Sequence, residues 1–106
     1  MERVKRIDAL LSMLQTEPKD IFLNYSLAIE YMAENNLELA LEQFLKVLDF
    51  QENYIPAHYQ LGKLWELKQD SGNALNYYRK GLEFAMHQKN NKAVNEFREA
   101  IFLLED

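Results

Sequence analysis

The chain has 106 residues, a length that fits one domain, with a formal net charge of −5 and an isoelectric point of about 5.0. Apolar residues make up 48% and charged residues 27%, which is typical of a globular chain and not of a disordered one. With 3 Gly and 2 Pro, it has few of the turn residues that a sandwich or barrel of short strands requires. The absence of Cys excludes disulfides, cysteine-ligated zinc, iron–sulfur clusters and cysteine nucleophiles.

The N-terminal segment, residues 1–18, predicts an amphipathic helix. Asp8, Ser12 and Gln15 interrupt its apolar residues, so it lacks the continuous core of a signal peptide. No run of 18 apolar residues occurs anywhere, and we expect no membrane insertion and a cytoplasmic location. A basic amphipathic helix can lie on a membrane, but the apolar stripe here is of the kind that a helical bundle buries. That stripe consists of Val4, Ile7, Leu10, Leu11 and Leu14.

The middle of the chain repeats itself with a period of 34 residues. Shifting the sequence by 34 places Leu27 on Leu61, Ala28 on Gly62, Tyr31 on Trp65, Ala40 on Ala74, Phe44 on Tyr78 and Leu48 on Leu82. The matches keep the size class of each side chain, and they need no gap. A fixed period of this length is typical of stacked helical hairpins.

Each block carries the same internal pattern, which resembles the tetratricopeptide repeat. The blocks read Leu27-Ala28-x-x-Tyr31 with Ala40-x-x-x-Phe44, and Leu61-Gly62-x-x-Trp65 with Ala74-x-x-x-Tyr78. Small residues let two antiparallel helices approach closely, and aromatic side chains fill the space beside the contact. The resemblance covers residues 21–54 and 55–88 directly. Asn24 and His58 depart from it, since the family often has a large aromatic residue at these positions.

The resemblance implies an all-α fold, a helix–turn–helix superhelix or α-solenoid with two full repeats and capping helices. We expect a single domain over residues 1–106, with an N-terminal capping helix (1–18), repeat one (21–54), repeat two (55–88) and a C-terminal capping helix (89–106). Ala93-x-x-x-Phe97 looks like the second helix of a further hairpin, so the helix before it appears in two hairpins. The expected antiparallel helices span 2–16, 20–34, 37–50, 54–68, 72–88 and 90–104.

The sequence offers no candidate for catalysis, a metal or a cofactor. It contains no phosphate-binding loop, dinucleotide fingerprint, zinc-protease motif or nucleophile elbow. Its two His, His58 and His87, are interpreted as a residue at a packing edge and a residue at a helix C-terminus. The glutamates at four-residue spacing are interpreted as a solvated acidic side: Glu30, Glu34, Glu38 and Glu42. The negative net charge makes a nucleic-acid partner unexpected.

In the resembling family, the first helices of successive repeats line a concave groove that holds a peptide or helix of a partner. By register, the groove positions here are Tyr25, Ile29, Met32, Tyr59, Gln60, Lys63 and Glu66. Tyr25 and Ile29 stand where a chaperone-binding carboxylate clamp would have Lys and Asn, so we do not expect that ligand. The expected function is a non-enzymatic adaptor that binds a protein or peptide. The alternative is a homodimeric scaffold whose groove or end is filled by a second copy.

Overall fold

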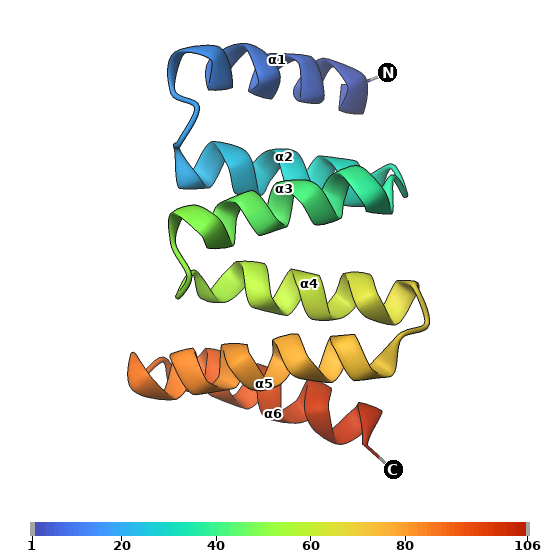
Figure 1. Cartoon of the computed structure of the whole chain (residues 1–106), viewed down its shortest axis with the longest axis vertical. Helices are drawn as coiled ribbons and strands as arrows, with labels where there is room; N and C mark the ends of the chain where they lie inside the picture. The colour runs from blue at the N-terminus through green and yellow to red at the C-terminus, as the bar shows by residue number, and fades with distance from the viewer. Residues whose placement is uncertain (1, 106) are drawn as a thin grey trace. The chain divides into compact units, whose positions relative to one another are not determined.

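The computed structural model describes residues 2–105, and over this range the chain forms α-helices and no strand, as the sequence predicts (Figure 1). The helices are α1 (Glu2–Thr16), α2 (Ile21–Ala33), α3 (Leu37–Phe50), α4 (Ile55–Leu67), α5 (Ser71–His87) and α6 (Asn91–Leu104). Each predicted helix boundary lies within one residue of the observed one. The chain divides into two compact units, residues 1–52 and residues 53–106, called here the N-terminal and C-terminal units.

In the N-terminal unit, α2 packs against both α1 and α3. The contact between α2 and α3 contains Leu27 and Ala28 on one helix and Ala40, Phe44 and Val47 on the other, all at most 2% exposed. Small side chains at positions 28 and 40 allow the two helices to approach, as the repeat pattern predicts. The core of this unit therefore lies between α2 and α3.

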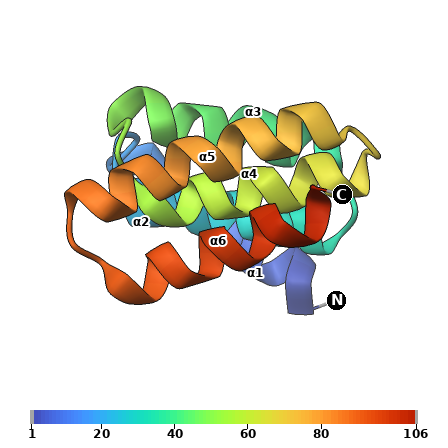
Figure 2. The ribbon, with the colours of Figure 1, turned by 90° about the horizontal axis from the view of Figure 1, so that it is seen from below.

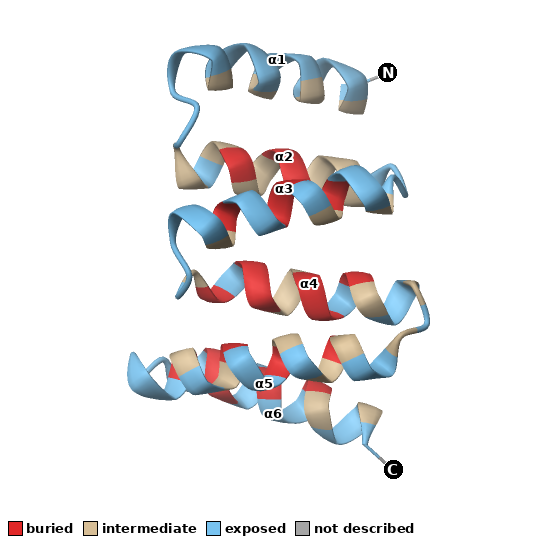
Figure 3. Cartoon of the chain, viewed as in Figure 1, coloured by how far each residue is buried: buried red, intermediate tan, exposed pale blue. Residues whose placement is uncertain are grey.

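Helix α1 is attached more loosely, and it has no buried residue (Figure 3). Ile7, Leu10 and Leu14 are half-buried, whereas Val4 and Leu11 are 50% and 43% exposed. The predicted apolar stripe is therefore only partly covered. Its main packing partner is α2, and one neighbouring helix covers only one side of so broad a stripe.

In the C-terminal unit, α5 packs against both α4 and α6. Helices α5 and α6 spread apart from the loop that joins them, and α4 lies behind the space between them (Figure 2). Two glycines mark the closest approaches of these helices. A Cβ atom added at Gly62 of α4 would lie 2.2 Å from the Tyr78 ring, and one at Gly81 of α5 would lie 2.3 Å from the Phe97 ring. Helix α5 thus contributes the large residue to one hairpin and the small residue to the next.

The turns between α2 and α3, α4 and α5, and α5 and α6 share one design. In each turn a single residue adopts the left-handed conformation, and the residue after it caps the next helix by accepting a hydrogen bond from a backbone N–H. The left-handed residues are Asn35, Gln69 and Lys89, and the caps are Asn36, Asp70 and Asn90. Hydrogen bonds from the Asn73 backbone and side chain lower the pKa of the Asp70 carboxyl. These turns reverse the chain within three residues and produce tight hairpins.

Candidate functional site

The three predicted groove residues of α2 lie within the N-terminal unit, and each is half-buried. The Tyr25 ring packs edge-on against Phe44, with the ring centroids 5.9 Å apart. This side chain therefore takes part in the packing of α2 on α3 as well as reaching the surface. Ile29 and Met32 present apolar surface on the same helix.

The four predicted groove residues of α4 lie within the C-terminal unit. Tyr59 and Gln60 are half-buried, and Lys63 and Glu66 are exposed. The Tyr59 ring is fixed by two neighbours, since its centroid lies 5.8 Å from that of Tyr78 and 5.7 Å from that of Phe97. The Lys63 ammonium lies 5.4 Å from the centre of the Tyr59 ring, a favourable cation–π distance.

Three of these residues line a cleft between α4 and α6. The cleft has a volume of about 340 Å³, and its lining consists of Tyr59, Lys63 and Glu66 from α4 with Glu96, Glu99, Ala100, Leu103 and Leu104 from α6. Gln60 does not line it. The predicted groove omits the α6 side, because it covers only the first helices of the two full repeats. The signal was present, since residues 96, 99, 100 and 103 share one face of a helix.

Glu66 is held in place at the wall of this cleft. The Tyr78 hydroxyl donates a hydrogen bond to a Glu66 carboxylate oxygen. Burial of the phenol raises the pKa of Tyr78, and the Glu66 carboxylate, as hydrogen-bond acceptor and as negative charge, raises it further. Tyr78 therefore stays a neutral donor across the physiological pH range, and it orients the Glu66 carboxylate from the core.

A second, smaller cleft lies in the N-terminal unit. Its volume is about 270 Å³, and its lining consists of Leu11, Leu14, Pro18, Asn24, Leu27, Gln43, Lys46 and Phe50. Its polar groups are engaged within the unit. The buried Asn24 amide donates to the Pro18 and Asp20 carbonyls, and it accepts a hydrogen bond from Gln43. This cleft therefore offers mainly apolar surface and the charge of Lys46.

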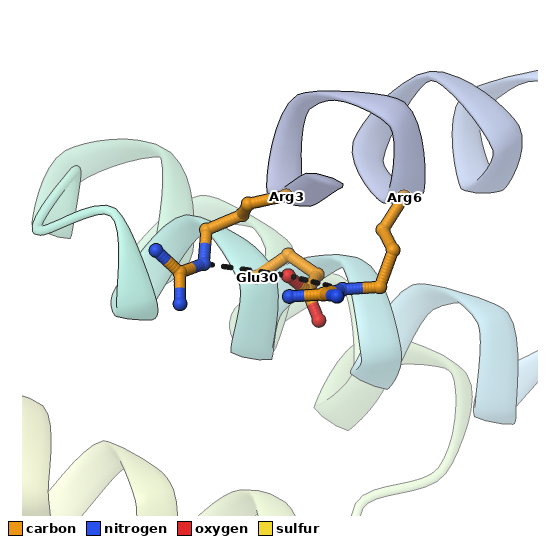
Figure 4. A network of polar contacts seen from close by, with 3 residues as sticks. All are labelled: Arg3, Arg6 and Glu30. Carbon is orange, nitrogen blue, oxygen red and sulfur yellow. Dashed lines mark ion pairs between the residues drawn. The ribbon is translucent and has the colours of Figure 1, made fainter. Parts of the chain in front are cut away.

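Two interpretations made from the sequence need correction. Glu30 is not part of a solvated acidic side, because one carboxylate oxygen lies 3.7 Å from the Nε of Arg3 and 3.2 Å from the Nε of Arg6 (Figure 4). These arginines belong to α1, so the contact joins α1 to α2. His58 is not at a packing edge, because it is 2% exposed and its ring packs 5.2 Å from that of Phe84.

Within the described part of the chain, no three His, Cys, Asp or Glu residues form a group that could hold a metal ion. Among residues 2–105, no helix has the length and apolar character needed to span a membrane.

Comparison with known proteins gives a family and several similar structures. A family model described as tetratricopeptide repeat matches residues 2–87. No curated protein matches the sequence. A tetratricopeptide repeat domain protein from Salinibacter ruber is similar in its crystal structure (29% identity, 80% of this chain, 94% of that chain, TM-score 0.74) and in its solution structure (31%, 83%, 89%, 0.78). A Bordetella parapertussis protein has the same fold at 24% identity, covering 92% of this chain and 85% of that chain, with a TM-score of 0.83.

Proposed function

Because the chain belongs to the tetratricopeptide repeat family, whose members generally mediate protein–protein interaction, we propose that it is a non-enzymatic adaptor that binds a peptide or helix of a partner protein. The proposed place of action is the cytoplasm. The observation that carries the proposal is the cleft between α4 and α6, where Tyr59, Leu103 and Leu104 offer apolar surface beside charged side chains. Protein-binding sites commonly combine an aromatic or aliphatic anchor site with a polar rim.

The residues proposed to bind the partner are those lining this cleft. Tyr59 provides a rigid ring, and Lys63 and Glu66 provide polar contacts. In the N-terminal unit we propose Tyr25, Ile29 and Met32 as a further contact surface, since they occupy the same register as the α4 residues. Gln60 is proposed as a neighbouring polar contact.

The test is a comparison of binding by three forms of the protein. Tyr25 and Tyr59 are poor sites for substitution because their rings also pack in the interior. Leu103 is 73% exposed and lines the cleft, so Leu103→Ala should leave the fold intact. Leu67→Ala is a matched control, because Leu67 is 58% exposed and lies outside the cleft lining.

The measurement is capture of partners from a lysate of the source cell on each immobilised protein. We expect a polypeptide that the native protein and Leu67→Ala retain and that Leu103→Ala loses. A partner that all three forms retain equally would move the binding site away from this cleft.

A second candidate function is a homodimeric scaffold, and the exposed end of α6 favours it. Phe102 and Leu103 are 77% and 73% exposed. Adjacent exposed apolar side chains of this size are commonly covered by another protein surface. Sedimentation velocity over a dilution series tests this function: a concentration-dependent dimer that Phe102→Ser abolishes would support it, and a monomer at every concentration would exclude it.

A further inference from the structure

We propose that the cleft between α4 and α6 selects a basic amphipathic segment, in which an aliphatic side chain is flanked by Lys or Arg. This inference rests on the proposed function and names the chemistry of the partner. It starts from the distribution of apolar surface and charge in the cleft. Tyr59, Ala100 and Leu104 are buried or half-buried and form its inner surface, while the exposed lining residues are mostly charged.

The charge of the lining is negative. It contains the three carboxylates of Glu66, Glu96 and Glu99 and the single ammonium of Lys63, which gives 1 − 3 = −2. Among the described residues, neither Glu96 nor Glu99 forms an ion pair, and both residues are exposed. Lys63 lies over the Tyr59 ring, which leaves the carboxylates of α6 without a cation from α4.

The geometry places these charges where a bound segment passes. Glu96 and Glu99 are three residues apart, so they lie on the same side of α6. Glu66 faces the cleft from α4, and the Tyr78 hydroxyl fixes its carboxylate. A segment lying in the cleft therefore meets carboxylates contributed by both helices.

The size of the cleft fits one anchor of a peptide. A volume of about 340 Å³ is at the low end of the range of ligand sites. One aliphatic side chain can contact Tyr59 and Leu104 there. The apolar stem of a neighbouring Lys or Arg can lie along Leu103 while its charged end reaches a glutamate.

Two other occupants fit the charge less well. An acidic segment would add like charge to the carboxylates of the cleft. The basic α1 of a second copy has the right chemistry, but its Arg3 and Arg6 are already held by Glu30 of their own chain. We therefore assign the cleft to a basic segment of a different protein.

The probes are two 14-residue peptides whose apolar residues are spaced to lie on one face of a helix. One contains Leu and Lys with Leu at alternating three- and four-residue intervals, and the other has Glu in place of every Lys. Each peptide is titrated into the full chain labelled with ¹⁵N, and its affinity is measured by fluorescence anisotropy. We expect the Leu/Lys peptide to shift the amide signals of Tyr59, Leu103 and their neighbours, and to bind more weakly as salt rises.

The variant that tests the role of charge is Glu96→Gln with Glu99→Gln, which keeps the side-chain shape. We expect it to bind the Leu/Lys peptide roughly fivefold to tenfold more weakly, because two exposed charge contacts are lost. The matched control is Glu34→Gln with Glu42→Gln, two exposed glutamates of the N-terminal unit whose loss changes the net charge equally. The control should bind as the native protein does.

The outcomes separate this inference from the proposed function. If the Leu/Glu peptide shifts the same cleft signals with equal or higher affinity, the cleft binds segments but does not select basic ones. If both double variants weaken binding equally, the attraction comes from net charge and the inference is wrong. If the Leu/Lys peptide leaves the cleft signals unmoved, the inference is also wrong, while the capture experiment with Leu103→Ala still decides the proposed function.

Discussion

Two glycines allow the helices of the C-terminal unit to pack closely. At Gly62 and Gly81 there is no room for a Cβ atom, because the Tyr78 and Phe97 rings occupy its place. Both rings are at most 1% exposed, so neither can swing into solvent without opening the core. These positions hold glycine for close approach, since neither has a positive φ.

Replacing either glycine with alanine should therefore destabilise the protein. We expect Gly62→Ala and Gly81→Ala each to lower the free energy of unfolding by roughly 1–3 kcal/mol, the usual cost of overpacking. Gly72→Ala is the control, because its Cβ would meet only the Asp70 carboxylate at 3.6 Å, and it should be neutral or slightly stabilising. Urea unfolding of the three variants measures the difference, and equal stability of all three would contradict the packing described here.

The repeat also differs between the two units at buried polar positions. Asn24 and Gln43 are hydrogen-bonded in the N-terminal unit. The residues 34 positions later, His58 and Tyr77, pack their rings with centroids 6.3 Å apart. The sequence marked Asn24 and His58 as departures from the family, but it did not reveal that each finds a partner on the next helix of its own hairpin.

At the scale of helices, α1 is the least embedded element. It has no buried residue, and its contact with α2 includes the ion pairs of Arg3 and Arg6 with Glu30 (Figure 4). The Glu30 side chain is 17% exposed, while Arg3 and Arg6 are about half exposed at 42% and 51%. Solvent screens such pairs, so their contribution is on the order of 1 kcal/mol or less.

Removing the charge of Glu30 should loosen α1 selectively. We expect Glu30→Gln to reduce the hydrogen-exchange protection of the α1 amides up to about fivefold, and to leave α3 unchanged. High salt should reproduce the effect in the native protein because it screens the same ion pairs. Glu34→Gln is the control, because Glu34 is an exposed residue directly after α2. An equal loss of protection in the Glu30→Gln and Glu34→Gln variants would show that the ion pairs do not hold α1.

Most of the helices were predictable because a capping residue and helical apolar spacing agree at the starts of α2, α3, α5 and α6. Asn36, Asp70 and Asn90 stand directly before an apolar pattern with helical period, and the structure uses each as a cap. The α6 wall of the cleft was not predictable by register. Shifting Tyr59 and Lys63 by 34 leads to Ala93 and Phe97, which the structure buries.

Glu30 was misinterpreted for a different reason. Its spacing relative to Glu34, Glu38 and Glu42 describes only its own neighbourhood in the sequence. Its partners lie on α1, and the pairing depends on how α1 packs on α2, which no local pattern encodes. Contacts between side chains of different helices could therefore not be predicted from the sequence.

At the scale of the whole molecule, the two units differ in how much they bury. Among the described residues, the C-terminal unit contains most of the buried ones (Figure 3). They include Tyr78 and Phe97, whose rings pack against each other and against the half-buried Tyr59. The N-terminal unit includes α1, which buries none. Local stability follows the density of buried contacts, so we expect unfolding to begin at the N-terminal end.

Two spectroscopic probes can test this order. The single tryptophan, Trp65, lies in α4 and reports on the C-terminal unit, whereas far-UV circular dichroism reports on all helices. In a urea titration we expect part of the helical signal to disappear before the Trp65 fluorescence changes. Coincident transitions would mean that α1 unfolds only together with the rest of the chain.

Helix α5 packs against both α4 and α6, and this limits where further helices could be added to the chain. The spacing from Gly62 to the matching Gly81 is 19 residues, whereas the spacing from Ala28 to Gly62 is 34. A tandem duplication of 34 residues therefore preserves every small-to-large contact if it falls before α5. A 34-residue duplication that ends with α5 keeps a copy of Gly81 against Phe97, whereas any other helix inserted before α6 must carry a small residue at that position to accommodate the Phe97 ring.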